Sequence, residues 1–206
     1  MATMTATEPT YLRLLSLISV AESHAGIYLK AWADVTPDSE LRDALTFVAG
    51  REASHGEVFR QRIQRLGCCV QEQEGEEEKF AEQMRIYGDP AISDLEKIRY
   101  GRAALEPGKL DPEFYTIDDR INDESVDSLT RDTLRWYIHE ERDSGELLRP
   151  VYARLTAASG AAHNGHAAGV SADTSAIMEC MTQGFAALQQ SLKELAEGLS
   201  KPARTR

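Results

Sequence analysis

The feature that most constrains this chain is the spacing of its apolar residues, which recur every three or four positions over four long segments. This spacing gathers apolar side chains on one face of an α-helix, whereas a half-buried strand alternates apolar and polar residues. No convincing alternating stretch occurs in the sequence. The sequence therefore predicts an all-α protein in which each helix buries one face against its neighbours.

The first two segments predict an antiparallel helical hairpin. Residues 10–35 carry one apolar face, and the sequence Thr36-Pro37-Asp38 that follows is typical of a helix start. A second helix is expected from Pro37 to Leu66, ending before Gly67. Because the link between the two helices is short, they should lie side by side.

The middle of the chain carries weaker signals. Residues 71–79 (QEQEGEEEK) form an acidic run, which we expect to be a solvated helix start or loop. A weaker helical stretch to about Arg85 should be followed by a helix that Asp89 caps and that runs to about Leu105. Residues 109–127 are rich in Asp, Pro and Asn, and we expect them to be irregular.

The last third of the chain changes character twice. A long helix with a kink at Pro150 is expected over residues 128–156. Residues 157–174 have the Ala-, Gly- and Ser-rich composition of a flexible linker. Residues 175–206 predict a separate amphipathic helix and tail, with an apolar seam over three heptads formed by Met178, Met181, Phe185, Leu188, Leu192, Leu195 and Leu199.

The C-terminal helix should not be stable alone, because a single helix of this length is marginal in water. Its seam must therefore be covered by another surface. The helix either folds back on its own bundle or pairs with a second copy of the chain, and the sustained heptad favours a homo-oligomer.

Charge and hydropathy narrow the classes of partner. The net charge of −11 argues against nucleic acid, because phosphate binding requires a basic face. Apolar stretches are too short to cross a bilayer, and residues 1–10 lack the basic start and apolar run of a signal peptide. The sequence thus predicts a cytoplasmic protein without nucleic-acid or membrane partners.

Polar residues interrupt the apolar faces of the first two helices at matching depth. On the second helix, spacings of four and three place Glu52 and His55 on the buried stripe, one turn apart. On the first helix, Glu22 lies between Ile18 and Leu29. A Glu on one helix and Glu-x-x-His on its neighbour can bind a first-row metal ion. A satisfied polar contact between the helices is the simpler alternative.

An internal repeat links the second helix to the last helix of the bundle. The sequence RDALTFVAGREASHGEVF (42–59) aligns without gaps to RDTLRWYIHEERDSGELL (131–148). The repeat pairs Glu52 with Glu141, which lies on the seam of its own helix, but it pairs His55 with Ser144.

With these motifs, residues 10–156 resemble the ferritin-like superfamily of four-helix bundles, and the rubrerythrin-type proteins in particular. In that family, helices one and three each supply a carboxylate and helices two and four each supply Glu-x-x-His, which together bind two iron ions. By position, the resemblance implies that Glu22, Glu52, His55 and Glu141 are metal ligands. It also gives Glu96 as the best candidate from the third helix.

The fourth helix departs from the family pattern. Ser144 stands where a histidine is expected, and a neutral hydroxyl is a poor iron ligand. A shifted frame, in which Glu140 and Asp143 face inward, restores a ligand but gives a poorer apolar seam. We therefore prefer the frame that contains Glu141.

Two functions remain open from the sequence. The first is a carboxylate–histidine iron site, with either two ions or one, whose second half is degraded. The second is a metal-free helical protein that keeps the fold and uses its surfaces for assembly or partner binding. The sequence indicates no substrate, and it does not decide whether the protein is an enzyme.

Overall fold

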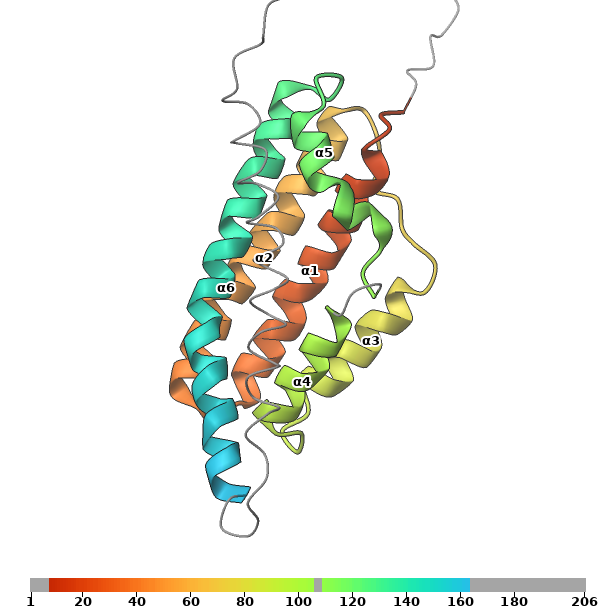
Figure 1. Ribbon diagram of the computed structural model, residues 1–206. Helices are drawn as coiled ribbons and strands as arrows, with labels where there is room; N and C mark the ends of the chain where they lie inside the picture. The colour runs from red at the N-terminus through yellow and green to blue at the C-terminus, as the bar shows by residue number, and fades with distance from the viewer. Residues whose placement is uncertain (1–7, 106–108, 164–206) are drawn as a thin grey trace, which may run out of the picture. The chain divides into compact units, whose positions relative to one another are not determined.

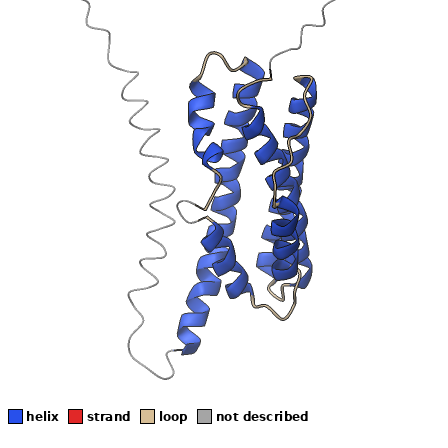
Figure 2. Ribbon diagram, turned by 90° about the vertical axis from the view of Figure 1, so that its right-hand side faces the viewer, coloured by secondary structure: helices blue, strands red, loops and turns tan. Residues whose placement is uncertain are grey.

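The computed structural model describes residues 8–105 and 109–163, with side chains through Ala158. This part of the chain is all-α and contains no strand, as the sequence predicted (Figure 2). Its elements are α1 (Leu12–Val35), α2 (Ser39–Arg65), α3 (Glu76–Tyr87), α4 (Asp94–Ala104), the 3₁₀ helix η1 (Pro112–Thr116), α5 (Ile117–Asn122) and α6 (Ser128–His163).

Three long helices, α1, α2 and α6, run alongside one another, and the short helices α3 and α4 lie beside α1 (Figure 1). The Nε1 of Trp32, near the end of α1, donates a 2.7 Å hydrogen bond to Asp94, the first residue of α4. Tyr28 of α1 stacks on Tyr87 of α3. The two short helices therefore cover the end of α1 that leads into α2.

Helices α1 and α2 approach so closely that two positions have no room for a side chain. A Cβ atom added to Gly56 of α2 would lie 2.3 Å from the Oγ of Ser23 and 2.8 Å from its backbone nitrogen. A Cβ atom added to Gly26 of α1 would lie 2.9 Å from the Cβ of Ala53. Ser19 completes the contact by donating a hydrogen bond to the carbonyl of Gly56. These glycines therefore set the spacing of the hairpin.

The buried apolar residues form two clusters at opposite ends of the long helices. The first includes Leu14, Ile18, Phe59 and Leu134. The second gathers around Trp32 and also contains residues of α2, α3, α4 and α6. Three buried polar residues, Glu22 of α1 and Glu52 and His55 of α2, lie between these two clusters along the length of the same helices.

The observed helices differ from the predicted ones mainly at their ends. The N-cap of α2 is Asp38, whose side chain accepts from the amide of Leu41, so the helix begins after Pro37. The cap of α4 is Ser93, and Asp89 instead accepts from a loop amide. Gly67, with φ of +76°, follows α2 as expected for a residue at a helix end.

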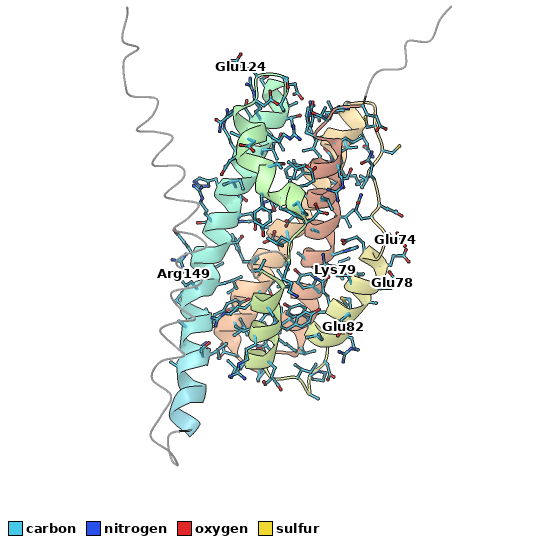
Figure 3. All side chains as sticks on the ribbon, turned by 45° about the vertical axis from the view of Figure 1, so that its right-hand side comes forward. Glu74, Glu78, Lys79, Glu82, Glu124 and Arg149 are labelled. Atoms are coloured by element: carbon cyan, nitrogen blue, oxygen red, sulfur yellow. The ribbon has the colours of Figure 1, made fainter. Side chains whose placement is uncertain are left out.

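The region predicted to be irregular, residues 109–127, contains η1 and α5. The Asp and Pro residues that suggested a loop act as start signals here, because Asp111 caps η1 and Pro112 is its first residue. The acidic run is solvated, as predicted, and Glu74, Glu78 and Glu82 extend from the outer side of the α3 region (Figure 3).

Helix α6 continues through Pro150 and extends to His163, into the predicted linker. The described helices up to Ala157 belong to one compact unit. The rest of the predicted linker and the C-terminal helix of residues 175–206 lie outside the described residues. None of the described helices is both long and apolar enough to cross a membrane.

Candidate metal centre

Four side chains from the three long helices converge between the two apolar clusters. Glu22 of α1, Glu52 and His55 of α2, and Glu141 of α6 each offer one ligand atom within 4.8 Å of the others. The sequence predicted this set from seam positions and from the internal repeat. Glu22, Glu52 and His55 are buried and Glu141 is half-buried.

The imidazole of His55 is the centre of the group. Its Nδ1 lies 3.2 Å from an oxygen of Glu52, 3.2 Å from Oε1 of Glu141 and 3.8 Å from an oxygen of Glu22. Its other nitrogen, Nε2, lies 3.7 Å from an oxygen of Glu140. Nδ1 therefore faces three carboxylates at once, while Nε2 faces a fourth.

Aromatic side chains of α6 fix the orientation of these groups. The rings of Trp136 and Tyr137 pack edge-on against the His55 ring, at centroid distances of 5.0 and 5.2 Å. The hydroxyl of Tyr137 donates a 2.7 Å hydrogen bond to Oε1 of Glu22. This leaves the other oxygen of Glu22 free to face Nδ1 of His55.

The low polarity of the surroundings changes the protonation of the cluster. Burial raises the pKa of Glu52 to about 7, against the opposing effect of His55. Burial also raises the pKa of Glu141. Burial alone would lower the pKa of His55, but the adjacent carboxylates of Glu141, Glu22 and Glu52 outweigh this effect and raise that pKa to about 11. Without another cation, the cluster therefore holds an imidazolium among carboxylates at neutral pH.

Two buried atoms of the cluster lack a hydrogen-bond partner, namely Nε2 of His55 and Oε1 of Glu141. The 3.2 Å contact between Oε1 of Glu141 and Nδ1 of His55 is an ion pair without hydrogen-bond geometry. A buried acceptor without a donor is costly, and a metal ion coordinated by Glu141 would satisfy it. Carboxylate and imidazole ligands suit first-row transition metals, so the residues present fit such an ion.

The cluster approaches the protein surface on its α6 side. The side chain of Glu141 is 35% exposed and that of Glu140 is 30% exposed, whereas His55 is fully buried. The side of the cluster nearest to solvent is therefore the one formed by the carboxylates of α6, and an ion would have to enter past them. An accessible entry path is a requirement for a metal site.

A guanidinium lies at the α6 end of the cluster, beside Ser144, the residue that the repeat pairs with His55. Arg51 of α2 donates to Oγ of Ser144 at 3.1 Å and to the carbonyl of Glu140 at 3.0 Å. It also forms ion pairs with the carboxylates of Glu140 at 3.2 Å and Asp143 at 2.7 Å. Ser144 is buried, and the Arg51 side chain is only 12% exposed.

The remaining candidate ligands lie outside the group. Glu96 is exposed at the start of α4, where it forms a capping box with Ser93. It was the expected third-helix ligand, and no residue of α3, α4, η1 or α5 joins the group among the described residues. Asp143, the ligand of the shifted frame, points to solvent with 58% exposure and pairs with Arg51. The frame containing Glu141 is the one that faces the cluster.

Sequence reasoning missed two residues that shape the site. The spacing of Tyr137 places it among the apolar residues of α6, but its hydroxyl donates a hydrogen bond to Glu22. Arg51 precedes Glu52 and lies off the predicted seam, so no periodicity marked it. His24 stacks on Phe80 and His139 is exposed, and both lie outside the group formed by the described residues.

Comparison of the chain with protein-family models, with curated proteins and with solved structures finds no match. The functional interpretation therefore rests on the geometry and chemistry of the four converging side chains.

Proposed function

We propose that this chain is a ferritin-like metal-binding protein in which Glu22, Glu52, His55 and Glu141 bind a divalent first-row transition metal ion, with iron as the physiological candidate. The observation that carries the proposal is the position of Nδ1 of His55, within 3.8 Å of oxygens from three separate carboxylates. Three carboxylates and one imidazole form a mixed ligand set that such ions accept. The resemblance of residues 10–156 to rubrerythrin-type proteins supports the choice of iron.

Each residue would have a distinct part in binding. Nδ1 of His55 would be the nitrogen ligand once it has lost its proton. Glu140, next to Nε2, would orient the imidazole ring, as carboxylates near metal-bound histidines commonly do. Tyr137 would hold one oxygen of Glu22 and leave the other for the ion. A bound iron ion would supply Lewis-acid or redox chemistry to this pocket.

A metal-free helical protein remains the second candidate, and one observation favours it. The imidazolium of His55 already balances part of the negative charge of the three carboxylates, since two of them lie 3.2 Å from it. A cluster whose negative charge is partly balanced by its own histidine can serve as a polar contact between helices, while the outer surfaces serve assembly or a partner.

Metal content distinguishes the two functions. The full-length protein, purified without chelators, should retain close to one equivalent of transition metal by elemental analysis. After removal and anaerobic reconstitution with Fe²⁺, it should again bind one equivalent. The variant His55→Gln should lose this binding, because an amide cannot replace the imidazole nitrogen.

The matched control is His139→Gln, which makes the same substitution at an exposed position of α6. This variant should bind as the wild type does. Wild-type protein that stays metal-free under all these conditions would refute metal binding and leave the structural function. Equal binding by the two variants would place the metal elsewhere on this acidic chain.

A further inference from the structure

The internal repeat relates the residues on both sides of the metal centre. The alignment of 42–59 with 131–148 pairs Glu52 with Glu141, and both carboxylates face the cluster. It also pairs His55 with Ser144 and Arg51 with Glu140. The cluster thus has a complete half on α2 and an incomplete half on α6.

The incomplete half is occupied by a cation of the chain itself. The guanidinium of Arg51 contacts Oγ of Ser144, the backbone carbonyl of Glu140 and the carboxylates of Glu140 and Asp143. Arg51 and Glu140 occupy equivalent positions of the repeat, so this position carries opposite charges on α2 and α6. The two side chains form an ion pair between the helices. With the Arg51 side chain only 12% exposed, the guanidinium is held in place rather than free in solvent.

We propose that Arg51 takes the place of a second metal ion and restricts the centre to a single ion on the His55 side. This inference rests on the proposed metal-binding function. A divalent ion beside Ser144 would have to sit next to a fixed positive charge, and repulsion between like charges is strong where water is excluded. Arginine keeps its charge at all accessible pH values, so the restriction does not depend on pH.

Arg51 has a second effect through Glu140. It holds the Glu140 carboxylate at 3.2 Å, and this carboxylate lies 3.7 Å from Nε2 of His55. Arg51 is therefore a positioning residue for the histidine ligand as well as a barrier to a second ion. Restoring the missing histidine at residue 144 should not be sufficient to create a second site.

The test is the metal stoichiometry of four full-length proteins: the wild type, Ser144→His, Arg51→Met and the double variant. Each is dialysed against Zn²⁺ held at a low free concentration by a chelator, and zinc and protein are then measured by elemental analysis. His55→Gln gives the background from surface carboxylates. Methionine keeps much of the length of the arginine stem while removing its charge.

We expect about one zinc per chain in the wild type, in Ser144→His and in Arg51→Met, and about two in the double variant. Two equivalents in the wild type, or in Ser144→His with Arg51 in place, would overturn the proposal. A double variant that shows wild-type circular dichroism and still binds one equivalent would overturn it as well.

The outcome for the wild type separates this inference from the function on which it rests. Zero equivalents would refute the proposed function and the inference together, whereas two equivalents would refute only the role of Arg51. If the double variant does not fold, the zinc stoichiometry of Ser144→His still tests whether a histidine at residue 144 is sufficient for a second site. That variant leaves Arg51, Glu140 and Asp143 unchanged and removes only the serine hydroxyl from the partners of Arg51.

Discussion

His55 controls the charge of the centre, because it is the one basic group among its four members. In the metal-free protein its imidazolium is stabilised by Glu141, Glu22 and Glu52, which raise its pKa to about 11. A metal ion that binds Nδ1 must displace this proton. Metal binding and proton release are therefore coupled at this residue.

We predict that the affinity for Zn²⁺ rises about tenfold per pH unit between pH 7 and 9, because each bound ion releases one proton from His55. Below pH 7 the dependence should be steeper, since the pKa of Glu52 is about 7 and this carboxyl must also lose its proton. Competition with a chromophoric chelator at several pH values measures this slope. An affinity independent of pH would contradict the assignment of His55 as a ligand.

The same two groups make the metal-free protein sensitive to pH in the opposite sense. Because the pKa of His55 is higher in the folded protein, its charged form stabilises the fold fully below about pH 6.5, the pKa of histidine in an unfolded chain. This stabilisation is lost as the pH rises towards 11, the pKa in the folded protein. A raised carboxyl pKa costs stability as the pH rises from about 4.5 to about 7. Both effects lower the free energy of unfolding as the pH increases.

We therefore predict that the metal-free protein is less stable to urea at pH 8 than at pH 5.5. Saturation with Zn²⁺ should remove this difference or reverse its sign, because the ion binds the folded state. Urea denaturation with and without metal at the two pH values provides the comparison. Greater stability of the metal-free protein at pH 8 would show that the cluster is not buried as described.

At the scale of the helices, the position of the ligands depends on the close approach of α1 and α2. Gly56 follows His55 directly, and a Cβ atom added to it would meet Ser23, which follows Glu22. A side chain at this position would separate the helices that carry the first three ligands. The distance between α1 and α2 therefore sets the geometry of the metal centre.

Gly56→Ala should destabilise the protein by about 1–3 kcal/mol, the usual cost of overpacking, and should also weaken metal binding. Gly50→Ala is the matched control on the same helix, because its added Cβ meets nothing within 4 Å. There the higher helix propensity of alanine should add about 0.5–1 kcal/mol of stability. Thermal denaturation and zinc titration of both variants test the prediction, and equal stabilities would argue against close helix packing.

The helix scale also shows what the sequence can and cannot reveal. The seam of α2 located Glu52 and His55 because the apolar spacing on both sides fixed which face is buried. The error at Glu96 arose because its helix is short, and the Ser93-x-x-Glu96 pattern is a capping box. Arg51 could not be assigned, since its partners are on α6 and its role depends on how the two helices meet.

At the scale of the whole molecule, the acidic chain contains a described unit of helices and a C-terminal segment outside the described residues. Self-association is predicted from the heptad seam between Met178 and Leu199. The full chain should sediment as an oligomer, and a chain ending at Ala158 should be a monomer with the same metal content. The same oligomeric state for both chains would remove the C-terminal helix as the assembly element.

The central claim is that a single ion binds between α1, α2 and α6, and anomalous X-ray diffraction from crystals of the zinc-loaded protein tests it most directly. The account predicts one strong peak per chain at the zinc edge, about 2.0–2.2 Å from Nδ1 of His55 and from oxygens of Glu22, Glu52 and Glu141. It also predicts no peak beside Ser144, where Arg51 is bound. Peaks confined to surface carboxylates, or a second peak at Ser144, would contradict the account.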